Sequence, residues 1–308
     1  MKSIVKSAII LSAVALVMNS CGDKNYYYGE DDSRKIALSS RVTLNPEARL
    51  QELQIESGQE LSLYITPSGN TTELLYANVN IIANGSGGFT AQTMYYPIDG
   101  RNIDLYAIHP YSATASLTNA VDFAISADQY IQKNYLNSDL LHATAMNKPR
   151  SGDPISMVFS HKLSKIDFTI VSNDVDIDLA ILNGVQVLNT RPATTINMIN
   201  GNISPATGNV VSVDAYGAYG SPEARNSVTG IHAIIVPQTI PAGTQLFRII
   251  VGRQSYIYTT TEEIEFESGL QYSNTLTITA GQITLESSIT EWGDGGSIGG
   301  GVQPEPIP

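Results

Sequence analysis

Hydrophobic and polar residues alternate with a period of two along most of this chain. In residues 36–44 the apolar side chains fall on one face and the polar ones on the other. The apolar face carries Ile36, Leu38, Val42 and Leu44. Because successive side chains of a β-strand point to opposite faces, this alternation predicts a half-buried strand, which Pro46 would end.

Similar runs follow throughout the sequence, separated by clusters of turn-forming residues. They include Leu61/Leu63/Ile65, Ala77/Val79/Ile81, Ile103/Leu105/Ala107 and Val121/Phe123/Ile125. Later runs are Ile155/Met157/Phe159, Ile166/Phe168/Ile170, Val185/Val187 and Ile196/Met198, the last with an Asn200-Gly201 hairpin turn leading back to Ile203. Further strands are expected over residues 246–251, 256–259, 274–279 and 282–292, and the apolar run 230–237 predicts a central strand. Short strands at such spacing are typical of a β-sandwich.

A predicted linker divides the chain into two parts. Residues 147–154 contain two prolines and a glycine and predict a linker between an N-terminal β-sandwich over 36–154 and a C-terminal one over 155–293. The alternation changes phase within residues 160–165, which predicts a bulge or a kink. A helix is expected only around residues 126–145. The Gly-rich and Pro-rich residues 294–308 predict an extended tail.

Composition agrees with an all-β protein outside the cytosol. Charged residues make up 15 % of the 308 residues, the net charge is −12, and Tyr outnumbers Phe by 16 to 6. A chain with this much negative charge repels phosphate backbones and anionic lipid head groups, which argues against nucleic-acid binding.

The N-terminus predicts export as a lipoprotein. Two lysines precede an apolar run of about eleven residues that is too short to span a bilayer, and Ser20 then precedes Cys21, the single cysteine of the chain. Residues 1–20 are therefore expected to be a signal peptide, and Cys21 to be acylated at the start of the mature chain. Residues 21–35 would form a flexible tether between the lipid and the fold.

No motif in the sequence points to catalysis, a metal or a cofactor. The four histidines do not stand at spacings that build a metal site, and His161 and His232 are expected to be hydrogen-bonded structural residues. Asp174, Asp176 and Asp178 resemble the start of a calcium loop, but the glycine and glutamate that such a loop needs are Leu179 and Val185 here. Alternation instead predicts the three carboxylates on a solvated strand face.

Several segments, taken in their order, resemble the fimbrillin family of Bacteroidia, which comprises the type V pilins and their relatives. The segment VFSHKLSKI at residues 158–166 is the most specific. The others are DLYAIHPYS (104–112), SDLLHA (138–143), IIVPQ (234–238), FESGLQY (266–272) and ITEWG (289–293).

The resemblance implies two transthyretin-like antiparallel β-sandwich domains in tandem and a surface-exposed outer-membrane lipoprotein that becomes part of a fimbrium, without enzymatic activity. An Arg-specific, trypsin-like protease would remove the first strand, and a C-terminal strand of the next subunit would fill the groove by β-augmentation. Partners are then other fimbrillin subunits, the protease, and membrane lipid through Cys21.

Two sets of residues carry this hypothesis. Cleavage after Arg49 would release the whole strand at residues 36–44, whereas cleavage at the alternative site, Arg41, would leave half of it. The groove would lose about four apolar side chains, each contributing roughly 1.5–3 kcal/mol. The expected donor is residues 282–292, whose apolar residues are Ile283, Leu285, Ile289 and Trp292.

The alternative interpretation is a surface glycan-binding lipoprotein or tip adhesin that does not polymerise. That function requires exposed aromatic platforms, for which the sequence offers the tyrosines of residues 26–28 and the pair Tyr95 and Tyr96.

Overall fold

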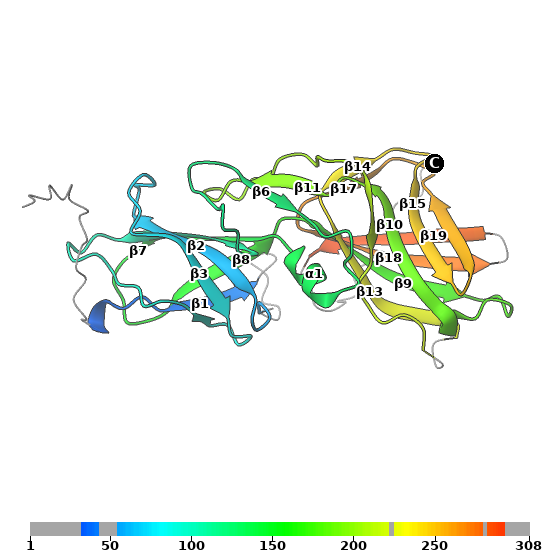
Figure 1. Ribbon diagram of the computed structural model, residues 1–308, viewed down its shortest axis with the longest axis horizontal. Coiled ribbons are helices and arrows are strands. Elements are labelled where there is room, and N and C mark those ends of the chain that lie inside the picture. The colour runs from blue at the N-terminus through cyan, green and yellow to red at the C-terminus, as the bar shows by residue number, and fades with distance from the viewer. Residues whose placement is uncertain (1–31, 43–53, 222–224, 280–281, 293–308) are drawn as a thin grey trace, which may run out of the picture.

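The computed structural model describes residues 32–42, 54–221, 225–279 and 282–292. The molecule is elongated, and two β-rich lobes follow one another along its long axis (Figure 1). Its buried hydrophobic residues form two clusters, one drawn from residues 36–159 and one that is centred on the C-terminal lobe. The prediction of an all-β fold is confirmed, because the described residues contain nineteen strands, one short α-helix and two 3-10 turns. The division into two tandem domains stays a prediction.

The N-terminal lobe is one seven-stranded sheet in the order β1-β8-β7-β5-β2-β3-β4. Its strands are β1 (Leu38–Val42), β2 (Glu60–Pro67), β3 (Tyr76–Ala83), β4 (Phe89–Thr90), β5 (Ile103–His109), β7 (Leu141–Lys148) and β8 (Ile155–His161), and the 3-10 turn η1 (Asp32–Arg34) precedes them. The central strand β5 is buried along its whole length, and Leu61, Leu63 and Ile65 of β2 are fully buried beside it. Alternating apolar side chains thus build this core as the sequence predicts.

The C-terminal lobe consists of two larger sheets and two short strand pairs. One sheet has the order β13-β9-β18-β19, with β9 (Ser164–Ser172), β13 (Ser227–Ile235), β18 (Leu270–Thr279) and β19 (Gln282–Glu291). The other has the order β12-β10-β15-β16, with β10 (Leu182–Thr190), β12 (Val211–Asp214), β15 (Gln245–Val251) and β16 (Gln254–Thr259). The pairs join β6 (Val121–Ala124) to β11 (Ala193–Ile196) and β14 (Gln238–Ile240) to β17 (Ile264–Phe266).

Packing between the two larger sheets forms the second core. In β9 every second residue is buried, including Ile166, Phe168 and Ile170. Phe168 meets Phe247 of β15 edge to face, with ring centroids 5.1 Å apart. The period-two pattern therefore identified the inward face of this strand correctly.

Two strands do not fall in the lobe to which the predicted domain boundary assigns them. β8 pairs with β7 and β1, and Ile155, Met157 and Phe159 belong to the first core. The boundary expected between residues 154 and 155 thus divides strands that the structure joins, because residues 147–154 contain the connection between β7 and β8 rather than an interdomain linker. In the other direction, β6 pairs with β11 of the C-terminal lobe.

The helix expected around residues 126–145 is present as α1 (Gln132–Asn137) but is shorter, since the rest of that range includes the start of β7. Two other local predictions were wrong. The phase change in residues 160–165 is neither a bulge nor a kink within one strand but the break between β8 and β9. The buried strand β13 is not central but lies at a sheet edge, where the side chain of Gln129 hydrogen-bonds both the amide and the carbonyl of Ile234 and so covers that edge.

Candidate functional site

Strand β1 closes the N-terminal sheet by contacting two different partners. Its five residues pair in parallel with β8, from Leu38 opposite Ile155 to Val42 opposite Phe159. On its other side, the amide of Ser40 donates a hydrogen bond to the carbonyl of Gly87 over 2.7 Å, just before β4. Both edges of β1 are thus hydrogen-bonded, and its removal would leave β8 with an unpaired edge.

The side chains of β1 follow the predicted alternation. Ile36 and Val42 are 6 % and 5 % exposed, Ser40 is also buried, and Leu38 is partly buried against the same core. These four residues form the inward face of the strand. The surface that β1 covers is therefore a groove. Along it lie successive sites for an isoleucine, a leucine, a serine and a valine.

Gly87 allows the close approach on the second side of this groove. Its backbone φ is +80°, and a Cβ atom added there would lie 3.2 Å from the carbonyl oxygen of Ser40. A left-handed φ and a tight backbone contact both favour glycine. This residue lies in the glycine-rich turn at 84–88, which the sequence shows only as a turn.

The residues predicted for lipidation and processing can be placed only in part. Cys21 and Arg49 lie outside the described residues. Arg41 lies within β1 opposite Val158 and is partly buried. Proteases prefer exposed loops, and the paired position of Arg41 within a strand is unfavourable for cleavage.

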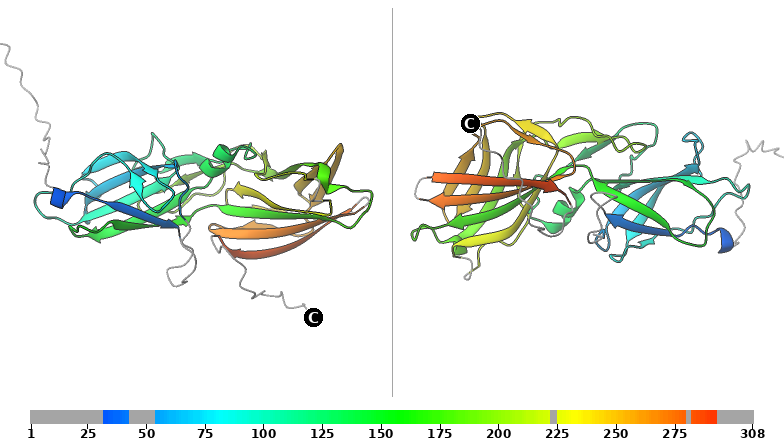
Figure 2. Two further views of the ribbon diagram at one scale, coloured as in Figure 1. Left: turned by 90° about the horizontal axis from the view of Figure 1, so that it is seen from below. Right: turned by 180° about the vertical axis from the view of Figure 1, so that it is seen from behind.

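The predicted donor segment is a sheet edge. β19 pairs over its ten residues with β18 in antiparallel register, and β18 pairs in parallel with β9 on its other side. Figure 2 shows β19 at the margin of the C-terminal lobe. Ile283 and Leu285 are partly buried, whereas Ile289 is 58 % exposed. The apolar face of β19 is therefore only partly buried in this position.

Trp292 follows β19 and is packed against the N-terminal lobe. It is 7 % exposed, its ring stacks on the His161 ring at a centroid distance of 3.9 Å, and its amide donates to the Gly269 carbonyl over 2.8 Å. His161 in turn binds the Asp139 carboxylate through Nδ1 at 2.8 Å. Sequence patterns could not have paired His161 with Trp292, which lie 131 positions apart.

The end of β1 and the end of β19 meet at one small cavity. Its volume is about 190 Å³, and Val42, Leu141, His161 and Trp292 are among the residues that line it. Val42 is the last described residue of β1, and Trp292 comes directly after β19. The candidate acceptor and the candidate donor are thus in contact with the same space.

The other histidines have structural partners, as predicted for His232. His232 Nδ1 lies 2.5 Å from the Asp167 carboxylate. Burial lowers the pKa of His109, whose Nδ1 lies 2.7 Å from the Asp139 carbonyl oxygen. No group of three or more His, Cys, Asp or Glu side chains suited to a metal occurs among the described residues.

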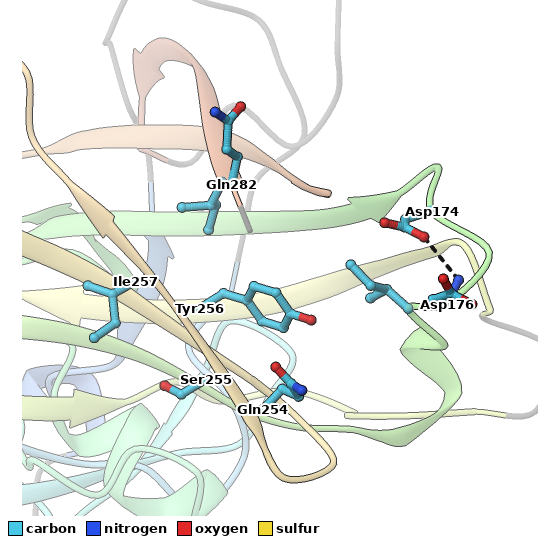
Figure 3. A pocket seen from close by; sticks show the side chains of 9 residues that line it. Asp174, Asp176, Gln254, Ser255, Tyr256, Ile257 and Gln282 are labelled. Atoms are coloured by element: carbon cyan, nitrogen blue, oxygen red, sulfur yellow. Dashed lines mark hydrogen bonds between the residues drawn. The ribbon is translucent and has the colours of Figure 1, made fainter. Parts of the chain in front are cut away.

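A wider cleft lies between β16 and β19, the edges of the two larger sheets of the C-terminal lobe. Its volume is about 490 Å³, and Figure 3 shows Tyr256, Gln282 and the turn with Asp174 and Asp176 around it. The Asp176 amide donates to the Asp174 carboxylate over 3.0 Å. Asp178 instead accepts a hydrogen bond from the Ala180 amide and caps the 3-10 turn η2 (Leu179–Ile181). The three aspartates therefore do not share a strand face as predicted, because they form a turn.

Two further observations bear on function. Tyr96 is 2 % exposed, so Tyr95 and Tyr96 do not form the open aromatic platform of a glycan-binding site; Tyr26 to Tyr28 lie outside the described residues. Of the helices in the described ranges, none has the length and apolar character needed to cross a membrane.

Within the described residues, the features brought together here are strand edges and the side chains packed on them, which is the arrangement expected of a structural protein. A family model described as fimbrillin-like matches residues 41–292. The chain belongs to this fimbrillin-like family, whose members are structural subunits of cell-surface fimbriae, and the resemblance seen in the sequence is confirmed.

Individual relatives agree with this assignment. The chain is 25 % identical to a candidate fimbrium subunit of Bacteroides uniformis, Fim1C, over 97 % of this chain and 99 % of the relative. It shares its fold with a crystal structure of a candidate cell adhesion protein from Bacteroides uniformis, with a TM-score of 0.64, 22 % identity, and coverage of 84 % of this chain and 98 % of the other. A candidate cell adhesion protein from Bacteroides ovatus gives a TM-score of 0.63, 17 % identity and the same coverages.

Proposed function

We propose that this protein is a fimbrial subunit that polymerises by donor-strand exchange after a protease removes β1. The single observation that carries the proposal is the position of β1, which is the first strand of the described fold and is hydrogen-bonded on both edges. Its loss would expose a groove where Ile36, Leu38 and Val42 were packed. Each such side chain contributes roughly 1.5–3 kcal/mol when buried, so an open groove favours capture of another strand.

The C-terminal strand β19 is suited to be that other strand. It lies at a sheet edge and pairs with one neighbour, β18. Its removal would therefore break one ladder of hydrogen bonds and leave the remaining three strands of its sheet paired. An internal strand such as β9, which has neighbours on both sides, would cost two ladders.

Processing after Arg49 is the step that would trigger assembly. Cleavage there frees all of β1, whereas cleavage after Arg41 leaves Val42 in the groove. The same cut separates the folded chain from Cys21, through which we propose that the precursor is held in the outer membrane as a lipoprotein. Processing would thus release the subunit and activate it together. Since similar proteins are described as cell adhesion proteins, we propose that the assembled fimbria contributes to adhesion.

Replacement of the processing arginine tests this proposal. In cells that express Arg49→Ala, the subunit should keep its N-terminal segment, and the heat-resistant ladders that fimbriae give on gels should fall at least tenfold. Arg253→Ala is the matched control, because Arg253 is an exposed arginine in the turn between β15 and β16. Ladders of unchanged abundance with an unchanged N-terminus in the Arg49→Ala strain would refute the proposed trigger.

A further inference from the structure

A cavity beside β10 and β12 is lined by tyrosine rings and carboxylates. Its volume is about 460 Å³, which is within the range of roughly 300–1,000 Å³ that is usual for small-molecule sites. Its lining includes Asp128 and Tyr130 before α1, Asn183 of β10, Asp214 at the end of β12, and Tyr219 beyond it. We call this space the tyrosine cavity. The proposed strand exchange uses none of these residues.

Tyr130 and Tyr219 form one flat aromatic surface at the tyrosine cavity. Their rings are nearly parallel, with 6° between the planes and the centroids 5.5 Å apart. The Tyr219 side chain is half-buried, and its hydroxyl donates a hydrogen bond to the Ala215 carbonyl. Tyr130 is 57 % exposed, although an aromatic ring gains from burial. One ring is thus held by the protein, and the other is open to solvent.

Backbone hydrogen bonds hold the two acidic residues of the cavity beside each other. The Gln129 amide donates to the Asp214 carbonyl over 3.1 Å, and the Asp214 amide donates to the Ala127 carbonyl over 2.7 Å. Asp128 and Asp214 are therefore partners in a parallel β-bridge. The side chain of Gln129 is fully buried and bonded to the backbone of Ile234. The cavity is thus built on fixed backbone and needs little ordering when a ligand binds.

The polar groups that the cavity offers are hydrogen-bond acceptors. One oxygen of Asp214 accepts from Gln186 Nε2 over 2.6 Å, and Gln186 accepts from Arg248 over 3.0 Å. Among the described residues, no donor is bonded to the Asp128 carboxylate or to the second oxygen of Asp214. The Asn183 side chain donates to a backbone carbonyl, which leaves its oxygen as a further acceptor. A ligand that satisfies these groups must offer several donors.

The flat shape of the aromatic surface favours a neutral ligand over a cation. Aromatic cages for cations place ring faces on several sides of the charge, whereas the rings of Tyr130 and Tyr219 are parallel to each other. Arg248, which is linked to Asp214 through Gln186, also offsets part of the negative charge. A pyranose sugar has C–H groups on one face and hydroxyl donors around its edge. These two features match the aromatic surface and the acceptors.

We propose that the tyrosine cavity binds a neutral pyranose sugar, whose C–H face stacks on Tyr130 and whose hydroxyl groups donate to Asp128 and Asp214. This inference goes beyond the proposed function, which assigns no ligand to the subunit. Neither β1 nor β19 lines the cavity. Sugar binding is therefore expected of the separate, uncleaved chain.

Saturation-transfer NMR on the purified full-length chain tests this site. The probes are the methyl pyranosides of D-glucose, D-galactose, D-mannose, L-fucose and N-acetyl-D-glucosamine. At least one of them should receive saturation, most strongly at the ring protons of one face. Tyr130→Ala should lower this transfer roughly fivefold, as expected for the loss of an aromatic contact. Tyr130→Phe keeps the ring and should retain most of the transfer.

Tyr256→Ala is the matched control. Tyr256 is a half-buried tyrosine in the wider cleft between β16 and β19 (Figure 3), so its loss should leave the transfer unchanged. Because Tyr130 is exposed, urea denaturation of Tyr130→Ala should give nearly the stability of the parent chain. A weaker NMR signal in that variant then reports the site rather than the fold.

Two results would overturn the inference. Loss of transfer in Tyr256→Ala, with none in Tyr130→Ala, would assign the sugar to the wider cleft. Absence of transfer to every one of the pyranosides would exclude the sugar, and transfer to tetralysine in the same experiment would identify a cationic ligand in its place. Since the uncleaved chain is used, neither result bears on strand exchange, and failure of strand exchange would leave the sugar site standing.

Discussion

Gly87 is the residue on which the second edge of the acceptor groove depends most. It combines a φ of +80° with a backbone that passes close to the Ser40 carbonyl. Any strand that replaced β1 would meet the same backbone, so the requirement for glycine concerns the assembled state as well as the single chain.

The variant Gly87→Ala should therefore lower the free energy of unfolding by about 1–2 kcal/mol, since a left-handed backbone costs an L-residue that much. Urea denaturation of the purified full-length chain measures this loss. Gly152→Ala is the control, because no atom lies within 4 Å of a Cβ added at Gly152. Equal stabilities of the two variants would show that Gly87 is not required.

His161 holds Trp292 against the N-terminal lobe. Because Trp292 is the single tryptophan of the chain, its fluorescence reports this contact alone. In His161→Ala, acrylamide should quench the fluorescence more strongly, and unfolding should cost about 0.5–1.5 kcal/mol less, as expected for loss of an aromatic pair. His232→Ala should leave the quenching as it is, since the His232 ring lies beside the tilted ring of Tyr135 instead, with centroids 6.4 Å apart. Unchanged quenching in His161→Ala would argue against the stack.

His109 should make the fold sensitive to mild acid. Burial lowers its pKa below the usual 6.5, an effect that the nearby Asp139 opposes and His161 reinforces. The unfolded chain then binds more protons than the folded one as the pH falls below about 6.5, so stability is present above that pH and is lost below it, by at most about 1.4 kcal/mol per pH unit.

Urea denaturation of the parent chain and of His109→Gln at pH 7.5 and 5.5 tests this effect. The parent should lose more stability over that interval than the variant, and the two should respond alike between pH 7.5 and 8.5. An equal loss in both proteins between pH 7.5 and 5.5 would mean that His109 does not titrate on unfolding.

At the scale of elements, β1 and β19 are related by what they bury. Both alternate apolar and polar residues, but β1 has its apolar face in a core and β19 has its own at a sheet margin. Assembly should consequently depend on the inward positions of β19 and tolerate changes between them.

The pair Leu285→Asn and Thr284→Asn tests that dependence. Leu285→Asn places a polar amide on the apolar face of β19 and should reduce ladder formation by the processed chain at least tenfold, because a buried amide without a partner is costly. Thr284→Asn changes the adjacent, exposed position and should have little effect. Densitometry of unheated gels measures both, and a similar loss in the two variants would contradict the assigned faces.

The sequence predicts individual strands better than their partners. Period-two runs located β3 and β9 because burial on one face dictates the alternation. The parallel pairs β1 with β8 and β9 with β18 join strands that are far apart in the chain, and no local pattern encodes them. For the same reason β8 was expected in the wrong half of the molecule.

The candidate site divides in the same way. Ile283, Leu285 and Ile289 follow from alternation and fall on one strand, whereas the contact of Trp292 with His161 depends on how the lobes pack.

At the scale of the whole molecule, the two ends of the exchange mechanism are adjacent. Val42 at the end of β1 and Trp292 after β19 line one cavity, together with residues of the N-terminal lobe such as Leu141. Loss of β1 would remove one wall of the space beside Trp292. Removal of β1, which opens the acceptor groove, is therefore expected also to weaken the packing of Trp292 and so to loosen β19 of the same subunit.

The measurement that tests the central claim most directly is the identity of the first residue of the subunit in fimbriae sheared from cells. Mass spectrometry of the isolated filaments should find chains that begin at Leu50, with no peptide from residues 36–42. Filament subunits that begin at Cys21 and retain the first strand would contradict the account.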